Sequence, residues 1–152
     1  MPSAQDIADA TFKVLWAQDR VAQALGMQAL SVGPGTATLR MVVRADMLNG
    51  LALCHGGMVT TLADSAFGFA SNSYNEQTVS SGLDVNLLAA AALGDVLTAT
   101  ACEISKAGRT GLVDVRVTNQ RGEAVALLRC RSYAIKGRAV VAGLPIGRAA
   151  AG

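Results

Sequence analysis

One carboxylic acid stands in the middle of a segment that is otherwise apolar or small. Asp64 lies within residues 58–74, where apolar positions recur at helical spacing around most of the circumference, a pattern typical of a buried helix. A carboxylate in such surroundings costs free energy unless it is paired, solvated or functional. A polar stripe shares its helix face: Thr60, Thr61, Gly68 and Ser71. On a cleft wall, Asp64 could activate water or attack an acyl carbon, and partial desolvation would raise its pKa. A hydrogen-bonded structural aspartate is the alternative.

The motif His55-Gly56-Gly57 stands where this helix is expected to begin. The first turn of a helix leaves backbone N–H groups unpaired, and the helix dipole there favours negative charge. Glycine lets a ligand approach that backbone closely. Such donors can form an oxyanion hole, which stabilises a carbonyl oxygen as it becomes negative. Taken alone, the motif favours an ordinary glycine-rich helix start.

The spacing of these two features predicts a site shared between two chains. Gly56 and Asp64 are eight residues apart, which is about 12 Å along a helix. One carbonyl group cannot easily contact both groups of the same chain. We therefore expect Asp64 to come from a partner, with the two helices antiparallel across a two-fold axis and two composite sites per dimer. Only 16% of residues are charged, against about a quarter in typical domains, which also favours burial between copies.

Two further polar residues precede the helix. Asn49 could orient a water molecule or a carboxylate through its amide, although Asn49-Gly50 is also typical of a turn. His55 is the only histidine, and no acid stands near it in the sequence to form a catalytic pair. We expect His55 to order the loop or to contact the carbonyl group, and a purely structural role is the alternative.

The hydrophobic pattern predicts a helix, a strand, a buried helix and then four strands. The first helix spans residues 3–25, with Ser3 and Asp6 as a capping box and Gly26 as its stop. The expected elements that follow are a strand at 36–44, a loop at 45–57, the helix at 58–74, and strands at 78–88, 95–105, 110–119 and 124–135. Short connections predict an antiparallel sheet wrapped around the apolar helix, an α+β arrangement. We expect one domain over residues 1–136 and a flexible tail over 137–152.

The composition argues against several other classes of protein. A net charge of +2, with scattered Lys and Arg and few aromatic residues, argues against nucleic-acid binding. Cys54, Cys102 and Cys130 fit neither a disulfide framework nor a metal-binding motif, so we expect reduced thiols and no metal. The first residues lack the apolar core of a signal peptide, and no run of about 20 apolar residues predicts a membrane helix. We therefore expect a soluble, cytoplasmic protein with no membrane partner.

Three segments together resemble the signature of hotdog-fold thioesterases, in particular the phenylacetic acid degradation thioesterases. They are Met47-Leu48-Asn49-Gly50, Cys54-His55-Gly56-Gly57 and Leu62-Ala63-Asp64-Ser65-Ala66-Phe67. The resemblance covers about residues 25–135. It implies a hotdog fold, in which an antiparallel sheet wraps around a long central helix. It also implies hydrolysis of acyl-CoA thioesters, here phenylacetyl-CoA or its ring-hydroxylated forms, by tetramers built from dimers. The CoA belongs to the substrate, and no cofactor is implied.

The resemblance assigns roles to four residues by position. Gly56 resembles the backbone donor that polarises the thioester carbonyl. Asp64 resembles the family's nucleophile or general base, and the sequence leaves open which of the two it is. Asn49 and His55 resemble supporting polar residues.

Three more residues are expected to contact the substrate: Gly57, Gly82 and Arg109. Arg109, in the turn Gly108-Arg109-Thr110, is the expected contact for CoA phosphates. Gly82 occupies a position where relatives often carry Ser or Thr. Because strand residues alternate, Ser81 would face the opposite side and Ser80 would share the face of Gly82. Relatives often follow this strand with Arg-Pro, where this chain has Leu88-Ala89-Ala90.

Four other functions are alternatives to thioester hydrolysis. The main alternative is a non-catalytic acyl-CoA-binding hotdog protein, and a scaffold or oligomerisation protein is the plainest one. Hotdog enoyl-CoA hydratases carry a His five residues after the Asp, where this chain has Phe69. A cysteine hydrolase built on Cys54 lacks a credible partner base.

Overall fold

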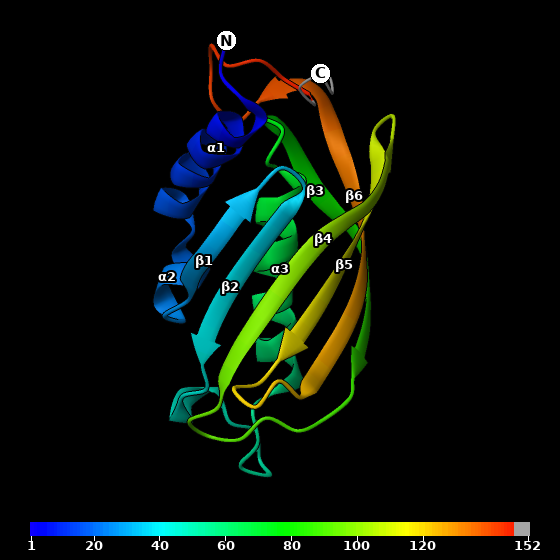
Figure 1. The fold of residues 1–152 in the computed structure, drawn as a ribbon. Helices are drawn as coiled ribbons and strands as arrows, with labels where there is room; N and C mark the ends of the chain where they lie inside the picture. The colour runs from blue at the N-terminus through cyan, green and yellow to red at the C-terminus, as the bar shows by residue number, and fades with distance from the viewer. Residues whose placement is uncertain (148–152) are drawn as a thin grey trace.

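The structure, a computed structural model, describes residues 1–147 as one antiparallel sheet with helices on its concave side. The elements are α1 (Ala4–Gln18), α2 (Arg20–Ala24), β1 (Gln28–Gly33), β2 (Thr36–Val42), the 3-10 turn η1 (Ala45–Met47), α3 (Gly56–Ser71), β3 (Glu76–Leu87), β4 (Val96–Ala107), β5 (Thr110–Thr118) and β6 (Ala124–Ala139). The six strands are ordered β1-β2-β4-β5-β6-β3. Figure 1 shows the curved sheet around α3, with α1 and α2 beside the β1 edge.

The central helix α3 packs into the curve of the sheet, as its apolar pattern predicts. Leu62 and Phe67 are at most 1% exposed, and each such burial contributes roughly 1.5–3 kcal/mol. Ala99 and Ala101 on β4 are fully buried, and their small side chains let the helix approach the strands closely. The predicted α+β arrangement, with the sheet wrapped around the helix, is confirmed.

The N-terminal region differs from the prediction in two ways. The expected helix at 3–25 is interrupted at Asp19, whose extended backbone ends α1 and caps α2. A strand that the pattern did not predict, β1, follows at Gln28–Gly33 and pairs with β2. This strand is exposed over most of its length and carries a bulge between Ala29 and Ser31, so it lacks the alternation that marks a half-buried strand.

Strand β3 is a long edge strand of the sheet. It spans twelve residues and pairs only with β6, so its outer backbone groups have no strand partner among residues 1–147. Val79 and Leu87 on this edge are 51% and 54% exposed. A long, apolar, uncovered edge is a template for pairing with a strand of another chain.

A β-bulge at Ser81 reverses the facing of side chains along β3. Ser80 pairs with Ser132, which is buried, whereas Gly82 pairs with Arg131, which is exposed on the outer face of the sheet. The prediction that Ser80 and Gly82 share a face is therefore wrong. One extra residue in the bulge shifts the period-two alternation that the prediction assumed.

The predicted tail begins as ordered structure. Strand β6 continues to Ala139, three residues beyond the predicted domain end. The buried amide of Asn75 then donates hydrogen bonds to the carbonyls of Val141 and Leu144, both at 3.0 Å. Residues 148–152 of the predicted tail lie outside the described residues. Within the described part, none of the helices combines the length and apolar character that crossing a bilayer requires.

Candidate active site

Asp64 opens into a hollow of about 570 Å³ on the face of α3 that the sheet leaves uncovered. Residues of α3, of β3 and of the α1–α2 junction line it, among them Leu15, Asp19, Phe69 and Val79. The Asp64 side chain is exposed and accepts no hydrogen bond from, and makes no ion pair with, residues 1–147. Partial desolvation raises its pKa, and the negative charge of Asp19 raises it further. An unpaired carboxylate in a partly apolar hollow is available to a bound molecule.

Most residues of the predicted polar stripe beside Asp64 line the hollow. Thr61, Gly68 and Ser71 line the hollow with Asp64, whereas Thr60 does not. The hydroxyls of the stripe are occupied by the helix itself, since Thr61 Oγ1 donates to the carbonyl of Gly57 at 2.8 Å. Asp64 therefore remains the ionisable group that this face of α3 offers.

A serine of β3 also lines this hollow. Ser80 enters from β3, because the bulge at Ser81 turns it towards α3. Gly82, the expected substrate contact, lies on the opposite face, where a Cβ would overlap a guanidinium nitrogen of Arg131. The structure thus brings Ser80, and not Gly82, together with Asp64.

The first turn of α3 leaves one backbone donor free. The ring of His55 caps the helix, since Gly57 N–H donates to His55 Nδ1 at 3.2 Å. The amides of Met58 and Val59 donate to the carbonyl of His55. Gly56 N–H has no acceptor among residues 1–147 and stands at the positive end of the helix dipole. This geometry fits an oxyanion-binding donor at Gly56, with His55 and Gly57 paired to each other.

Gly56 opens into a second hollow, of about 310 Å³, separate from that of Asp64. Asn49, Leu87 and Leu88 line it as well. Asn49 Oδ1 accepts hydrogen bonds from the N–H groups of Leu51 and Leu53, so this side chain fixes the loop. The amide nitrogen of Asn49 has no acceptor among the described residues and can donate to a bound molecule. Of the predicted catalytic residues of one chain, Asp64 lines the first hollow, Gly56 and Asn49 line the second, and His55 lines neither.

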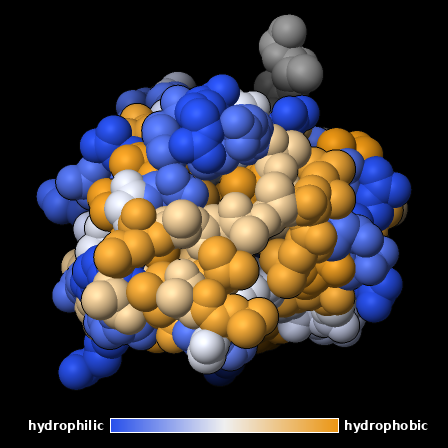
Figure 2. All heavy atoms as spheres, turned by 90° about the horizontal axis from the view of Figure 1, so that it is seen from below, coloured by the Kyte–Doolittle hydropathy of each residue, from blue (hydrophilic) through white to orange (hydrophobic). Residues whose placement is uncertain are grey.

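The end of the molecule around this second hollow is apolar. Figure 2 views this end and shows hydrophobic side chains over much of its surface. The large exposed hydrophobic residues here include Leu87 at the end of β3 and the loop residues Leu51, Leu88 and Leu93, which are 53–80% exposed. Apolar surface of this extent is typical of an interaction site.

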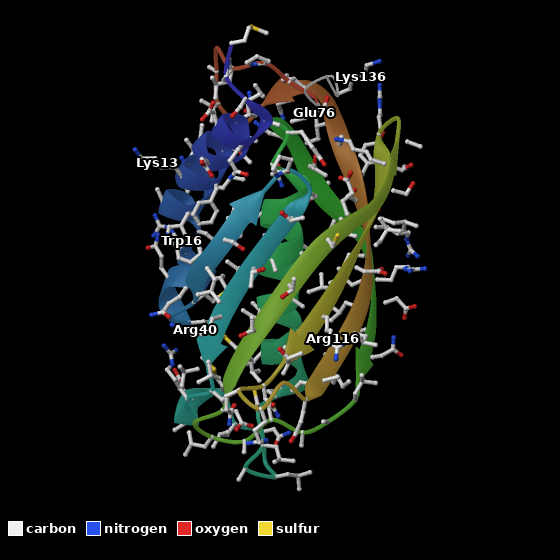
Figure 3. The ribbon with its side chains drawn as sticks, in the orientation of Figure 1. Lys13, Trp16, Arg40, Glu76, Arg116 and Lys136 are labelled. Carbon is white, nitrogen blue, oxygen red and sulfur yellow. The ribbon has the colours of Figure 1, made fainter. Side chains whose placement is uncertain are left out.

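Arg109 lies at the other end of the molecule. It lines a hollow of about 350 Å³ with Glu76 and Lys136, and its guanidinium donates to the Tyr133 hydroxyl at 3.3 Å. Figure 3 shows Glu76 and Lys136 at the end opposite the loops that precede α3. Within one chain, Arg109 is thus not brought together with Gly56.

Comparisons with known proteins show the family of this chain. The thioesterase superfamily profile matches residues 51–126, which include Gly56, Asp64 and Ser80. The acyl-coenzyme A thioesterase PaaI of Escherichia coli (strain K12) is 40% identical over 123 residues, covering 81% of this chain and 88% of that protein. This chain belongs to the thioesterase superfamily. The predicted family and enzyme class are thereby confirmed for this thioesterase.

Solved structures of other thioesterases share its fold. The E. coli PaaI protein, from the phenylacetic acid degradation operon, superposes with a TM-score of 0.87 at 38% identity, covering 90% of this chain and 99% of that one. A hypothetical thioesterase of Streptococcus pneumoniae TIGR4, solved with coenzyme A, has a TM-score of 0.72 at 26% identity and covers 74% and 91%. The predicted hotdog fold of this thioesterase is confirmed.

Burial limits the chemistry of Cys54 in this thioesterase. Cys54 is buried beside Gly56, and burial raises the pKa of its thiol, which disfavours the nucleophilic thiolate. Residues 1–147 contain no group of three or more His, Cys, Asp or Glu side chains placed to hold an ion.

Proposed function

We propose that this thioesterase hydrolyses aryl-acetyl thioesters of CoA, phenylacetyl-CoA or its ring-hydroxylated forms, to the free acid and CoA. One observation carries the proposal: an unpaired carboxylate, Asp64, faces one hollow, and an unpaired helix N-terminal donor, Gly56 N–H, faces another. Thioester hydrolysis needs both a group that activates the attacking oxygen and a donor for the oxyanion.

The two hollows become one site if two chains pair through their β3 edges. Antiparallel β3 strands would place the two α3 helices antiparallel across a two-fold axis, so that Asp64 of one chain approaches Gly56 of the other. The exposed β3 edge and the apolar end around Leu87 and Leu88 support this pairing. We propose a dimer with two composite sites, and a tetramer formed from two such dimers.

In this site, Asp64 acts on the acyl carbon either through water or directly. As a general base, it takes a proton from a water molecule whose oxygen attacks the carbonyl, and the negative oxygen accepts Gly56 N–H. The C–S bond then breaks, and CoA leaves as the thiol after gaining a proton. As a nucleophile, a carboxylate oxygen attacks, CoA leaves, and water hydrolyses the resulting anhydride. The geometry is compatible with both routes.

Ser80 and Asn49 support Asp64 in this proposal. The Ser80 hydroxyl lies in the same hollow as Asp64, and Asn49 has a free amide nitrogen in the Gly56 hollow. The S. pneumoniae protein has been crystallised as two alanine variants, of an aspartate and of a threonine sixteen residues later. Asp64 and Ser80 are likewise sixteen residues apart.

The shape and lining of the Asp64 hollow support an aromatic acyl group. Leu15, Phe67, Phe69 and Val79 give it apolar walls, and its 570 Å³ can hold a phenyl ring. The operon named for E. coli PaaI points to the same acid. For the CoA, Arg109 and Lys136 would contact phosphates, and the CoA-bound S. pneumoniae structure supports a CoA site on this fold.

The proposed reaction needs neither a cofactor nor a metal, since its acid–base and electrostatic groups come from the chain. A cytoplasmic location stays a prediction, compatible with the three free cysteines.

Release of free CoA from a panel of thioesters tests this function. The panel contains phenylacetyl-CoA, its ring-hydroxylated forms, short aliphatic acyl-CoAs and crotonyl-CoA, each run with wild type and with Asp64→Asn. We expect aryl-acetyl substrates to be preferred and Asp64→Asn to lose about 10²-fold or more in kcat. Asp9→Asn, which removes a carboxylate outside the hollow, serves as the control and should match wild type. Binding of acyl-CoA without any hydrolysis would instead favour the non-catalytic acyl-CoA-binding protein.

A further inference from the structure

Asp64 shares its hollow with a second carboxylate that the mechanism above does not use. We propose that Asp19, at the break between α1 and α2, is a positioning residue that acts through Asp64, its negative charge strengthening Asp64 as a base. The inference rests on the proposed function, because it concerns the same reaction.

The position of Asp19 is fixed by the fold. Its side chain caps α2, with Ala22 N–H donating to Oδ1 at 2.9 Å, and its own N–H donates to the carbonyl of Trp16. The second carboxylate oxygen, Oδ2, has no hydrogen-bond partner among residues 1–147. The cap therefore holds a charged group at the wall of the hollow in one orientation.

The helix pair that carries Asp19 is docked on α3 by aromatic contacts. The rings of Phe12 and Trp16 on α1 lie 5.0 Å and 5.7 Å from that of Phe69, centroid to centroid. Phe69 belongs to the same helix as Asp64 and also lines the hollow. Asp19 and Asp64 are thus held on two elements that share one packed cluster.

No positive charge lies between the two acids in the described structure. Among residues 1–147, Asp19 and Asp64 are the only ionisable residues that line the hollow. Its other polar members are Gln18, Thr61, Ser65, Ser71, Asn72, Thr78 and Ser80. The buried thiol of Cys130 on β6 lies within range of the charge of Asp64. Burial, together with the charges of Asp64 and Asp114, raises the pKa of this thiol to about 12, so it stays neutral. Among the described residues that line the hollow, no positive charge therefore offsets the repulsion between the two carboxylates.

This repulsion has a direct consequence for acid–base chemistry. A neighbouring negative charge favours the protonated form of Asp64, and it accordingly raises the pKa of that group. A carboxylate with a higher pKa is a stronger base towards water. An acyl group that fills the hollow would also displace water from between the two acids, and their interaction strengthens as the local dielectric falls.

Two neutral variants separate the charge of Asp19 from its capping role. Asn and Ser both cap helices about as well as Asp, so Asp19→Asn and Asp19→Ser keep α2 but remove the charge. Asp9→Asn is the matched control, because it neutralises an acid of α1 that does not line the hollow. The pKa of Asp64 is measured by carbon-13 NMR of the side-chain carboxyl in the intact assembly, with the signal assigned from its absence in Asp64→Asn.

We expect the Asp64 pKa to fall in both Asp19 variants and to stay unchanged in Asp9→Asn. The acid limb of kcat/KM against pH should move to lower pH in the same two variants, and the plateau should drop severalfold. An unchanged Asp64 pKa in both Asp19 variants, or an equal fall in Asp9→Asn, would overturn the inference even if Asp64→Asn abolishes hydrolysis. If Asp64→Asn retains hydrolysis, the proposed function fails, and Asp19 loses its positioning role whatever the titration shows.

Discussion

Leu87 lies directly against Gly56: a Cβ placed on Gly56 would come 2.6 Å from Leu87 Cδ1. The adjacent Gly57 is different, since a Cβ there would meet only the His55 ring, at 3.4 Å, an ordinary contact. The two glycines of one motif therefore face different constraints, and only Gly56 lines the second hollow.

This difference predicts opposite outcomes for two alanine substitutions. Gly56→Ala should displace Leu87 and shift the Gly56 N–H, lowering kcat/KM by about 10²-fold, as small misplacements of catalytic groups do. Gly57→Ala should keep activity and raise the free energy of unfolding by about 0.4–1 kcal/mol, because alanine restricts the unfolded chain. CoA-release kinetics and thermal melts measure both. Equal activity losses in the two variants would show that the free Gly56 N–H has no special role.

The capping role of His55 predicts that an asparagine can replace it. His55→Ala removes the acceptor for Gly57 N–H and should cost about 1 kcal/mol of stability. His55→Asn supplies a new capping oxygen and should retain both stability and most of the activity. Thermal melts and CoA-release rates of the two variants decide the matter. An activity loss in His55→Asn as large as in His55→Ala would mean that the imidazole contacts the substrate.

The raised pKa of Asp64 predicts that its ionised form destabilises the fold. The folded protein binds the proton of the Asp64 carboxyl more tightly than the unfolded chain does, because the pKa of this group is higher in the folded state. The free energy of unfolding therefore decreases as the pH rises through the folded pKa. Below a pH of about 4 the carboxyl is protonated in both states, and this loss of stability is absent. Asp64→Asn should thus melt at a higher temperature than wild type at pH 7, and the difference should vanish on acidification. A wild type that is more stable than Asp64→Asn at pH 7 would reveal a stabilising partner for this carboxylate in the assembly.

The bulge in β3 predicts different roles for two neighbouring serines. Ser80→Ala removes the hydroxyl in the Asp64 hollow and should lower kcat about tenfold or more, since a hydrogen bond to a charged group contributes roughly 1.5–3 kcal/mol. Ser81 Oγ donates to the carbonyl of Arg131 at 3.3 Å, away from that hollow, so Ser81→Ala should leave kcat near wild type. The reverse order of effects would mean that the strand faces differently in the active assembly.

A composite site predicts that two inactive variants restore each other. In a mixed dimer of Asp64→Asn and Gly56→Ala chains, one site carries both substitutions and the other carries neither. Unfolding and refolding the two chains together at equal amounts should give about a quarter of wild-type activity, because half the dimers are mixed and each has one intact site. Mixing without refolding serves as the control. Activity that stays at the level of the separate variants would place Asp64 and Gly56 of one chain in the same site.

The sequence predicted the elements with strong periodicity and the residues they position. Helix α3 was evident because Leu62, Phe67 and their neighbours form an apolar pattern that only a buried helix satisfies. Asp64 stood out against that pattern, and its place in a hollow followed from the small residues beside it.

The features that the sequence interpretation missed depend on single residues with little local signal. The break between α1 and α2 consists of one extended residue, Asp19, and the residues on both sides of it are helical. The facing of Gly82 away from the hollow depends on one extra residue in a strand whose composition does not mark a bulge. The ordering of residues 141–145 depends on the side chain of Asn75, some 66 residues earlier in the chain.

The bulge at Ser81 also divides β3 into two halves. The residues that face α3 have even numbers in the first half and odd numbers in the second. Even-numbered Thr78 and Ser80 face α3 before it, and odd-numbered Leu83 and Val85 do so after it. A strand of regular alternation, one residue shorter, would place both halves as they are now. Deletion of Ser81 would therefore shorten β3 and leave all of its remaining side chains on their present faces. Deletion of a residue elsewhere in the strand would move the side chains of one half to the opposite face of the sheet. Homologous chains can thus differ by one residue at this point and still present the same hydroxyl to the same carboxylate.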